Sequence, residues 1–162
     1  MPILNTYYDP PLIFKNGHIS TVYSGLFRSG AKIEQKRERI SLSDSDFIDL
    51  DWSFTKKKTN KLIILLHGLE GNAQRAYITR SAKLFNENNY DAIAMNLRGC
   101  SGEQNRLYRS YNAGATEDLR EVVTHVLTNH SKYDHIIIKG FSLGGNLLLK
   151  YLGEPIRVPK EV

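Results

Sequence analysis

Residues 135–152 read HIIIKGFSLGGNLLLKYL, and this stretch decides the fold. The short, continuously apolar run His135–Lys139 is typical of a strand that is covered on both faces of a parallel sheet. Residues 140–144 then lead directly into a segment that is apolar nearly all round, which predicts a buried helix. The pattern G-x-S-x-G between a buried strand and a helix is the context of a nucleophile elbow, so Ser142 is the candidate catalytic nucleophile.

The segments before this stretch predict the rest of the sheet. The runs Arg37–Leu42 and Phe47–Phe54 alternate apolar and polar residues around a turn, which favours an antiparallel hairpin. Further buried strands are expected at Lys61–His67 and Tyr90–Met95, each followed by a helix. The order predicts an α/β fold with an antiparallel β-hairpin edge and then a βαβαβα parallel sheet.

The helices of this pattern have readable ends. The first is expected over Asn72–Asn88, with an apolar stripe made of Ala73, Ala76, Tyr77, Leu84 and Phe85. Asn89 is expected to close it in the left-handed conformation. The second begins near Ala115, with Glu117 and Asp118 in the first turn, where the helix dipole favours acidic side chains.

The first 30 residues lack such a pattern. Pro10-Pro11 and Asn16-Gly17 interrupt any long element, and a short helix is expected near Thr21–Phe27. We therefore divide the chain into an irregular and helical N-terminal segment, residues 1–30, and one α/β domain, residues 31–162.

Composition excludes several classes of protein. The chain has 162 residues, 41% of them hydrophobic, and a formal net charge of +5, which suits one domain with its own core. No signal peptide is visible, and no apolar run reaches the roughly 20 residues that span a bilayer. The basic clusters lack the aromatic pattern of a nucleic-acid interface. With Cys100 as its one cysteine, we predict a cytoplasmic protein without nucleic-acid partners; peripheral contact with a lipid surface stays open.

The segment HGLEG at residues 67–71 follows the first parallel strand and should lie beside Ser142. When a serine attacks an ester carbonyl, two backbone N–H groups stabilise the oxyanion that forms. We assign these oxyanion-hole donors to Leu69 and to Leu143, directly after the nucleophile, with Glu70 the weaker candidate. The His67 side chain is expected to fasten the loop.

Three arginines in the loop of residues 96–112 have two interpretations. Arg98, Arg106 and Arg109 lie on the rim of the expected site, where a phosphate or carboxylate of a substrate would find them. The interpretation that we favour pairs them with the acidic residues Glu103, Glu117 and Asp118.

Four motifs together resemble the YheT-like branch of the α/β-hydrolases, which includes bacterial esterases and eukaryotic abhydrolase-domain lipases. They are a segment from Pro10 to Tyr23, LHGLEG at residues 66–71, NLRGCSGE at 96–103 continuing to 107, and GFSLGGN at 140–146 continuing to 154. The branch usually has a histidine after the tyrosine that matches Tyr111, whereas this chain has Asn112.

The resemblance implies a protein about twice as long, with a cap and a catalytic triad in the chain order Ser, acid, His. The chain would then be an incomplete domain, truncated before the later strands, lacking its C-terminal half and inactive alone. No histidine present is a good substitute for the base: His135 opens its strand on the order of 20 Å from Ser142, and His67 belongs to the loop. Glu154 is expected to face away from Ser142.

Three functions remain open. The leading prediction is a serine ester hydrolase of the esterase or lipase type, which acts on a small-molecule or lipid ester through an acyl-serine intermediate. An acyltransferase would use the same acyl-enzyme and pass the acyl group to an alcohol. The third is a non-catalytic module in which Ser142 is idle. None of them is expected to need a cofactor or a metal.

Overall fold

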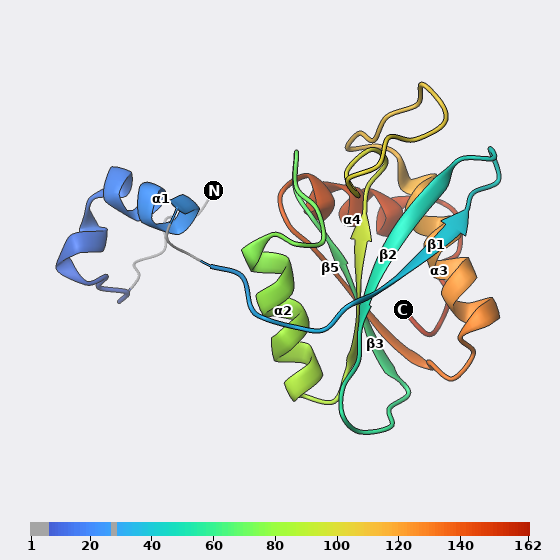
Figure 1. Ribbon diagram of the computed structural model, residues 1–162, viewed down its shortest axis with the longest axis horizontal. Helices are drawn as coiled ribbons and strands as arrows, with labels where there is room; N and C mark the ends of the chain where they lie inside the picture. Colours follow the sequence, from blue (N-terminus) through green and yellow to red (C-terminus); the bar gives the residue numbers. More distant parts are fainter. Residues whose placement is uncertain (1–6, 27–28) are drawn as a thin grey trace.

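The computed structural model describes residues 7–26 and 29–162. In it five strands form one mixed sheet in the order β1-β2-β4-β3-β5 (Figure 1). The strands are β1 (Lys36–Ser41), β2 (Phe47–Ser53), β3 (Lys61–Leu66), β4 (Asp91–Asn96) and β5 (His135–Gly140). β2 is antiparallel to β1 and to β4, and β3 runs parallel to both β4 and β5. The predicted hairpin edge and parallel sheet are confirmed.

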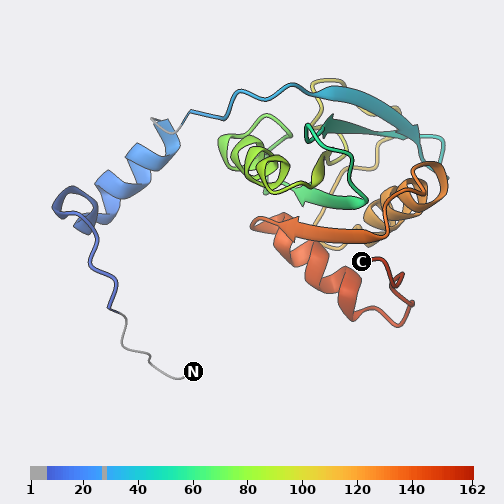
Figure 2. The same ribbon diagram turned by 90° about the horizontal axis from the view of Figure 1, so that it is seen from below.

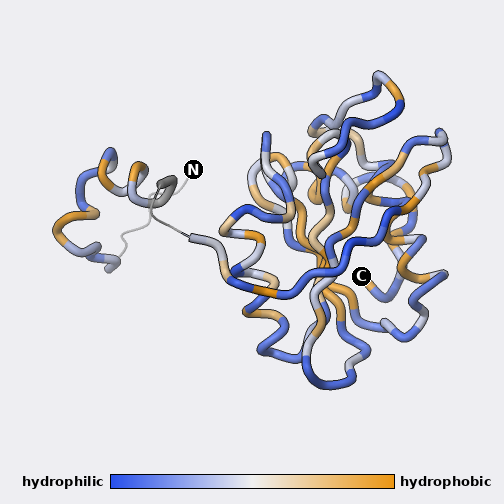
Figure 3. The backbone as a smooth tube through the Cα atoms, viewed as in Figure 1, coloured by the Kyte–Doolittle hydropathy of each residue, from blue (hydrophilic) through white to orange (hydrophobic). Residues whose placement is uncertain are grey.

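Helices cover both faces of this sheet. They are α2 (Ala76–Glu87) on one face, and α3 (Thr116–Asn129) and α4 (Leu143–Gly153) on the other. In β3, Ile63 and Leu65 pack toward α2, whereas Leu62, Ile64 and Leu66 belong to the core under α3 and α4. This alternation buries the strand on both faces, as its apolar run predicted. Figure 3 shows the hydrophobic residues gathered along the central strands.

The first of these helices begins later than the sequence predicted. α2 starts at Ala76 because the Asn72 side chain accepts a hydrogen bond from the N–H of Gln74, which forms a turn in place of a helical start. The predicted stripe was therefore partly wrong. Its core side is made by Ile78 and Ala82, while Tyr77 and Leu84 are exposed. Asn89 does end the helix with a φ of +64°, as expected.

The last helix is not buried all round, which corrects the prediction from its composition. Leu147 and Tyr151 are fully buried, but Leu149 is 72% exposed and Leu152 is 50% exposed. The reason is that α4 packs against β5 and α3 on one side only, and β5 is the last strand of the sheet. Near the start of this edge, the N–H of Ile136 donates to the carbonyl of Glu161.

The N-terminal segment contains the short helix η1 (Leu12–Lys15) and the helix α1 (Gly17–Leu26), which stand apart from the sheet in Figures 1 and 2. As predicted, Asn16 interrupts this region: its extended backbone separates η1 from α1, and its side chain caps α1 by accepting from the N–H groups of His18 and Ile19. Phe27 of the predicted helix lies outside the described residues, and the division at residue 30 stays a prediction. No helix in the described ranges has the length and apolar character to cross a membrane.

Candidate active site

Ser142 lies in a sharp turn between β5 and α4. Its backbone has φ +53° and ψ −117°, a conformation that L residues rarely adopt. Because α4 begins at the next residue, the exposed Ser142 stands at the N-terminus of a helix, where the backbone favours negative charge. Its hydroxyl has no hydrogen-bond partner among the described residues.

Two glycines make this turn possible because no side chain fits at their positions. A Cβ at Gly140 would lie 2.3 Å from the carbonyl oxygen of Gly144. A Cβ at Gly144 would lie 2.6 Å from the carbonyl oxygen of His67 and 2.7 Å from that of Leu66. The strand, the helix and the end of β3 are therefore in direct backbone contact.

The loop of residues 67–71 lies against the serine. A Cβ at Gly68 would be 3.2 Å from the Cβ of Ser142. The His67 ring is fully buried, with Nδ1 2.7 Å from the carbonyl of Gly68 and Nε2 accepting from the N–H of Leu97 at 3.1 Å. Burial lowers the pKa of His67, so the imidazole is neutral. This supports the expectation that His67 fastens the loop.

Two tyrosines that the sequence analysis did not select also hold this loop. The hydroxyl of Tyr77 accepts from the N–H of Gly68 at 3.2 Å, and the hydroxyl of Tyr111 accepts from the N–H of Glu70 at 2.9 Å. The motif gave no sign of these contacts, because Tyr77 belongs to α2 and Tyr111 to the loop after β4.

These contacts leave specific backbone donors free. The N–H of Glu70 is occupied by Tyr111, whereas no described group accepts from the N–H of Leu69 or from that of Leu143. Free N–H groups beside an exposed serine are the donors that an oxyanion requires. The geometry is therefore compatible with Leu69 and Leu143 in this role and unfavourable for Glu70.

The histidines are not placed to activate Ser142. His67 is committed to the loop, His18 lies on α1, and His135 begins β5 at the end opposite to the serine. His125 and His130 bond to Glu38 on β1. No histidine donates to or accepts from Ser142.

An acidic residue, Glu154, and the thiol of Cys100 also have partners of their own. Glu154 accepts from Thr116 and Arg120 of α3 at 2.7 Å each, and from Lys150. Hydrogen bonds from Lys150 and Thr116 lower the pKa of Glu154 to about 2. Burial raises the pKa of Cys100, which packs against the core. Neither group forms a hydrogen bond with Ser142 in the described structure.

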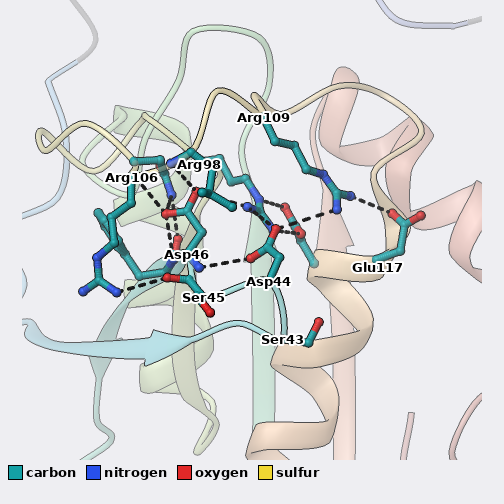
Figure 4. Close-up of polar contacts among 12 residues, drawn as sticks. Ser43, Asp44, Ser45, Asp46, Arg98, Arg106, Arg109 and Glu117 are labelled. Carbon is teal, nitrogen blue, oxygen red and sulfur yellow. Dashed lines mark hydrogen bonds and ion pairs between the residues drawn. The ribbon is translucent and has the colours of Figure 1, made fainter.

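The loop of residues 96–112 is anchored by a buried charge network (Figure 4). Arg98 is 2% exposed and binds Asp118 through two hydrogen bonds of 2.8 Å. It also contacts Asp46 at 3.2 Å and Asp44 at 2.8 Å, both from the turn between β1 and β2. The turn residues supply more of the anchor than the sequence indicated. The guanidinium of Arg98 is thus committed to the anchor, as the interpretation with acidic partners predicted.

Arg106 and Arg109 also bind protein groups, as we expected, but Glu103 is not their partner. Arg109 pairs with Glu117 at 3.2 Å, and Arg106 donates to the carbonyl of Ser45. Glu103, which we had assigned to this loop's arginines, binds Arg39 of β1 instead, at 2.6 Å. The reason is that β1 runs beside the loop, which sequence distance does not reveal.

A family model described as alpha/beta hydrolase fold matches residues 61–162. Phospholipase ABHD3 of Homo sapiens is 32% identical over 162 aligned residues, covering 94% of this chain and 39% of that protein. The YheT protein of Escherichia coli (strain K12) is 33% identical over 137 residues, covering 83% of this chain and 40% of that protein. The resemblance predicted from the four motifs is confirmed.

The chain spans about two fifths of the length of these curated relatives. Among solved structures, the Pyrococcus furiosus esterase Pf2001 aligns with a TM-score of 0.64 and 22% identity, covering 76% of this chain and 48% of that chain. At this level of identity the likeness concerns the fold alone.

Proposed function

Because this chain belongs to the α/β-hydrolase family, we propose that it carries the nucleophile of a carboxylic ester hydrolase, and that this nucleophile is Ser142. The observation that carries the proposal is the turn after β5. It presents an exposed serine at a helix N-terminus, beside two backbone N–H groups for which no described residue supplies an acceptor. This combination suits acyl transfer through serine.

In the proposed reaction the Ser142 hydroxyl attacks the carbonyl carbon of an ester and loses its proton to a base. The carbonyl oxygen becomes an anion and accepts from the N–H groups of Leu69 and Leu143. Donors of this kind typically contribute a factor of roughly 10²–10³ in kcat each. Collapse of the tetrahedral intermediate releases the alcohol, and water then hydrolyses the acyl-serine.

The base and its acidic partner are proposed to come from a longer form of the protein. This is supported by the positions of the histidines, none of which contacts Ser142, and by relatives that are more than twice as long. In this fold the acid and the histidine follow the serine in the chain. The 162-residue chain alone is then expected to be inactive.

The proposed substrate is a small-molecule or lipid ester. A lipid ester is supported by the relative named as a phospholipase. Peripheral contact with a lipid surface and a cytoplasmic location stay predictions. An acyltransferase would form the same acyl-serine, so analysis of the product with the complete protein, with and without an added alcohol, distinguishes the two.

The proposal is tested with a fluorophosphonate probe on the 162-residue chain and on a form extended to the natural stop codon. We expect labelling of the extended form only, lost in Ser142→Ala and kept in Ser110→Ala, a control at an exposed serine of the loop after β4. Labelling that survives Ser142→Ala would overturn the assignment. No labelling of either form would favour the non-catalytic module.

A further inference from the structure

A second cluster of reactive side chains lies at the edge of the sheet opposite to β5. Glu38 is on β1, the strand at the other edge, while His125 is on α3 and His130 directly follows it. The Glu38 Oε1 atom is 2.9 Å from Nε2 of His125 and 3.4 Å from Nε2 of His130. One ligand atom from each residue lies within 4.8 Å of the others.

We propose that Glu38, His125 and His130 form a binding site for a divalent metal of the zinc class. Two imidazoles and one carboxylate are a common ligand set for Zn²⁺, whereas Mg²⁺ and Ca²⁺ prefer oxygen ligands alone. Metal–ligand bonds of about 2.0–2.2 Å in tetrahedral geometry place ligand atoms about 3.3–3.6 Å apart. The 3.4 Å distance from Glu38 to His130 lies in this range and the 2.9 Å distance to His125 is shorter, so small side-chain movements would admit an ion.

The residues around the cluster orient its ligands. The indole N–H of Trp52 donates to the second carboxylate oxygen of Glu38 at 2.7 Å. The Trp52 ring also packs on His130, with centroids 4.7 Å apart. Outer contacts of this kind fix the orientation of metal-ligating carboxylates and imidazoles.

The electrostatics favour an ionised ligand. The Glu38 carboxylate faces the indole N–H of Trp52 and the Nε2 atoms of His125 and His130, with no second carboxylate in the cluster. The neighbouring residue of β1, Arg37, is engaged by Asp51 at 2.7 Å. The carboxylate is therefore available as a negative ligand.

The cluster also borders a surface hollow, which a ligand on the metal could occupy. Glu38 and His130 line a hollow of about 250 Å³ together with Lys36, Arg37, Trp52 and Phe54. With three protein ligands, a fourth position can face this hollow and hold water or a small anion, the arrangement of open zinc sites. A bound ion would link β1 to α3.

The experiment is calorimetric titration of the chelator-treated 162-residue chain with Zn²⁺ alone. We expect one ion per chain, and an affinity at least about 100-fold lower in Glu38→Gln, His125→Ala and His130→Ala. Trp52→Phe, which removes the indole donor to Glu38 and shortens the ring that packs on His130, should weaken binding about 10-fold. His18→Ala, at an exposed histidine on α1, is the matched control and should bind as the unmodified chain does.

Thermal unfolding provides a second measurement that does not depend on hydrolysis. Zn²⁺ should raise the melting temperature of the unmodified chain and of His18→Ala, and leave that of Glu38→Gln unchanged. Circular dichroism of each variant establishes that it is folded. Absence of saturable binding, or binding that persists in Glu38→Gln and His130→Ala, would overturn the proposal.

Discussion

The Ser142 turn follows β5 and the loop of residues 96–112 follows β4, so both lie at the end of the sheet where the parallel strands finish. They are held in place in different ways. The turn is shaped by backbone contact, with no room for a side chain at Gly140 or Gly144. The loop is anchored by buried charges centred on Arg98. A local motif specifies the first arrangement, while the second depends on residues far apart in sequence.

The largest effect is expected from filling the turn. In Gly140→Ala the new methyl group would lie 2.3 Å from the carbonyl oxygen of Gly144 and must displace α4 from the sheet. We expect a loss of about 5 kcal/mol in the free energy of unfolding, which approaches the whole stability of an ordinary domain. Urea-induced unfolding followed by circular dichroism measures it.

Gly153→Ala is the control, because a Cβ at this end of α4 meets nothing within 4 Å. Its stability should change by less than about 1 kcal/mol. An equal loss in the free energy of unfolding for both substitutions would show that the turn can accommodate a side chain at residue 140.

The charge anchor should come second. Arg98→Met removes the guanidinium and leaves the carboxylates of Asp46 and Asp118 buried without their cation. Breaking a buried ion pair from one side costs about 3–5 kcal/mol, so we expect a loss of about 4 kcal/mol at neutral pH. The midpoint of urea unfolding measures this loss.

Arg109→Met removes an exposed ion pair from the same loop, so it shows how much of the stability lost in Arg98→Met depends on burial. Its guanidinium pairs with Glu117, but the side chain is 38% exposed, and exposed pairs contribute about 0–1 kcal/mol. A loss as large as that of Arg98→Met would contradict the view that burial makes the difference.

The comparison also explains what the sequence could predict. The strands, the hairpin edge and the parallel sheet depend on apolar periods within short segments, and these predictions were confirmed. Asn89 was correctly expected to end α2, because its left-handed conformation is a local property. The family resemblance also depends on contiguous motifs.

The contacts between distant segments could not be predicted in this way. Glu103 pairs with Arg39, and Asp46 anchors a loop that begins 50 residues later, because the strand order 1-2-4-3-5 brings the hairpin beside β4. Tyr77 supports the loop of residues 67–71 from a position that appeared to belong to the core stripe. Glu38 and His130 meet for the same topological reason.

The third prediction concerns pH. Asp46 is fully buried, which disfavours its charge, but hydrogen bonds from Asn105 and from backbone N–H groups outweigh this and lower its pKa to about 2. An unfolded aspartate has a pKa of about 3.9, so the folded state gains about 2–3 kcal/mol above pH 4. This stability should be lost as the pH falls from about 4 to about 2.

The measurement compares the unfolding free energy of the unmodified chain and of Asp46→Asn across this pH range. The difference between them should shrink as the pH falls. Glu154, whose pKa is also about 2, titrates in the same range in both proteins and cancels in the comparison. A constant difference would show that the Asp46 charge contributes nothing to the anchor.

The smallest expected effect has the opposite sign and concerns the serine itself. Ser142 holds a φ of +53°, which costs a non-glycine residue about 1–3 kcal/mol, whereas glycine adopts it without strain. Glycine also loses more backbone entropy on folding, so Ser142→Gly should stabilise the chain by about 1 kcal/mol in urea unfolding while abolishing probe labelling of the extended form. Ser142→Ala keeps the strain and should leave stability unchanged. If Ser142→Gly instead destabilises the chain, the turn is held by contacts of the side chain, and the contrast with the charge-anchored loop fails.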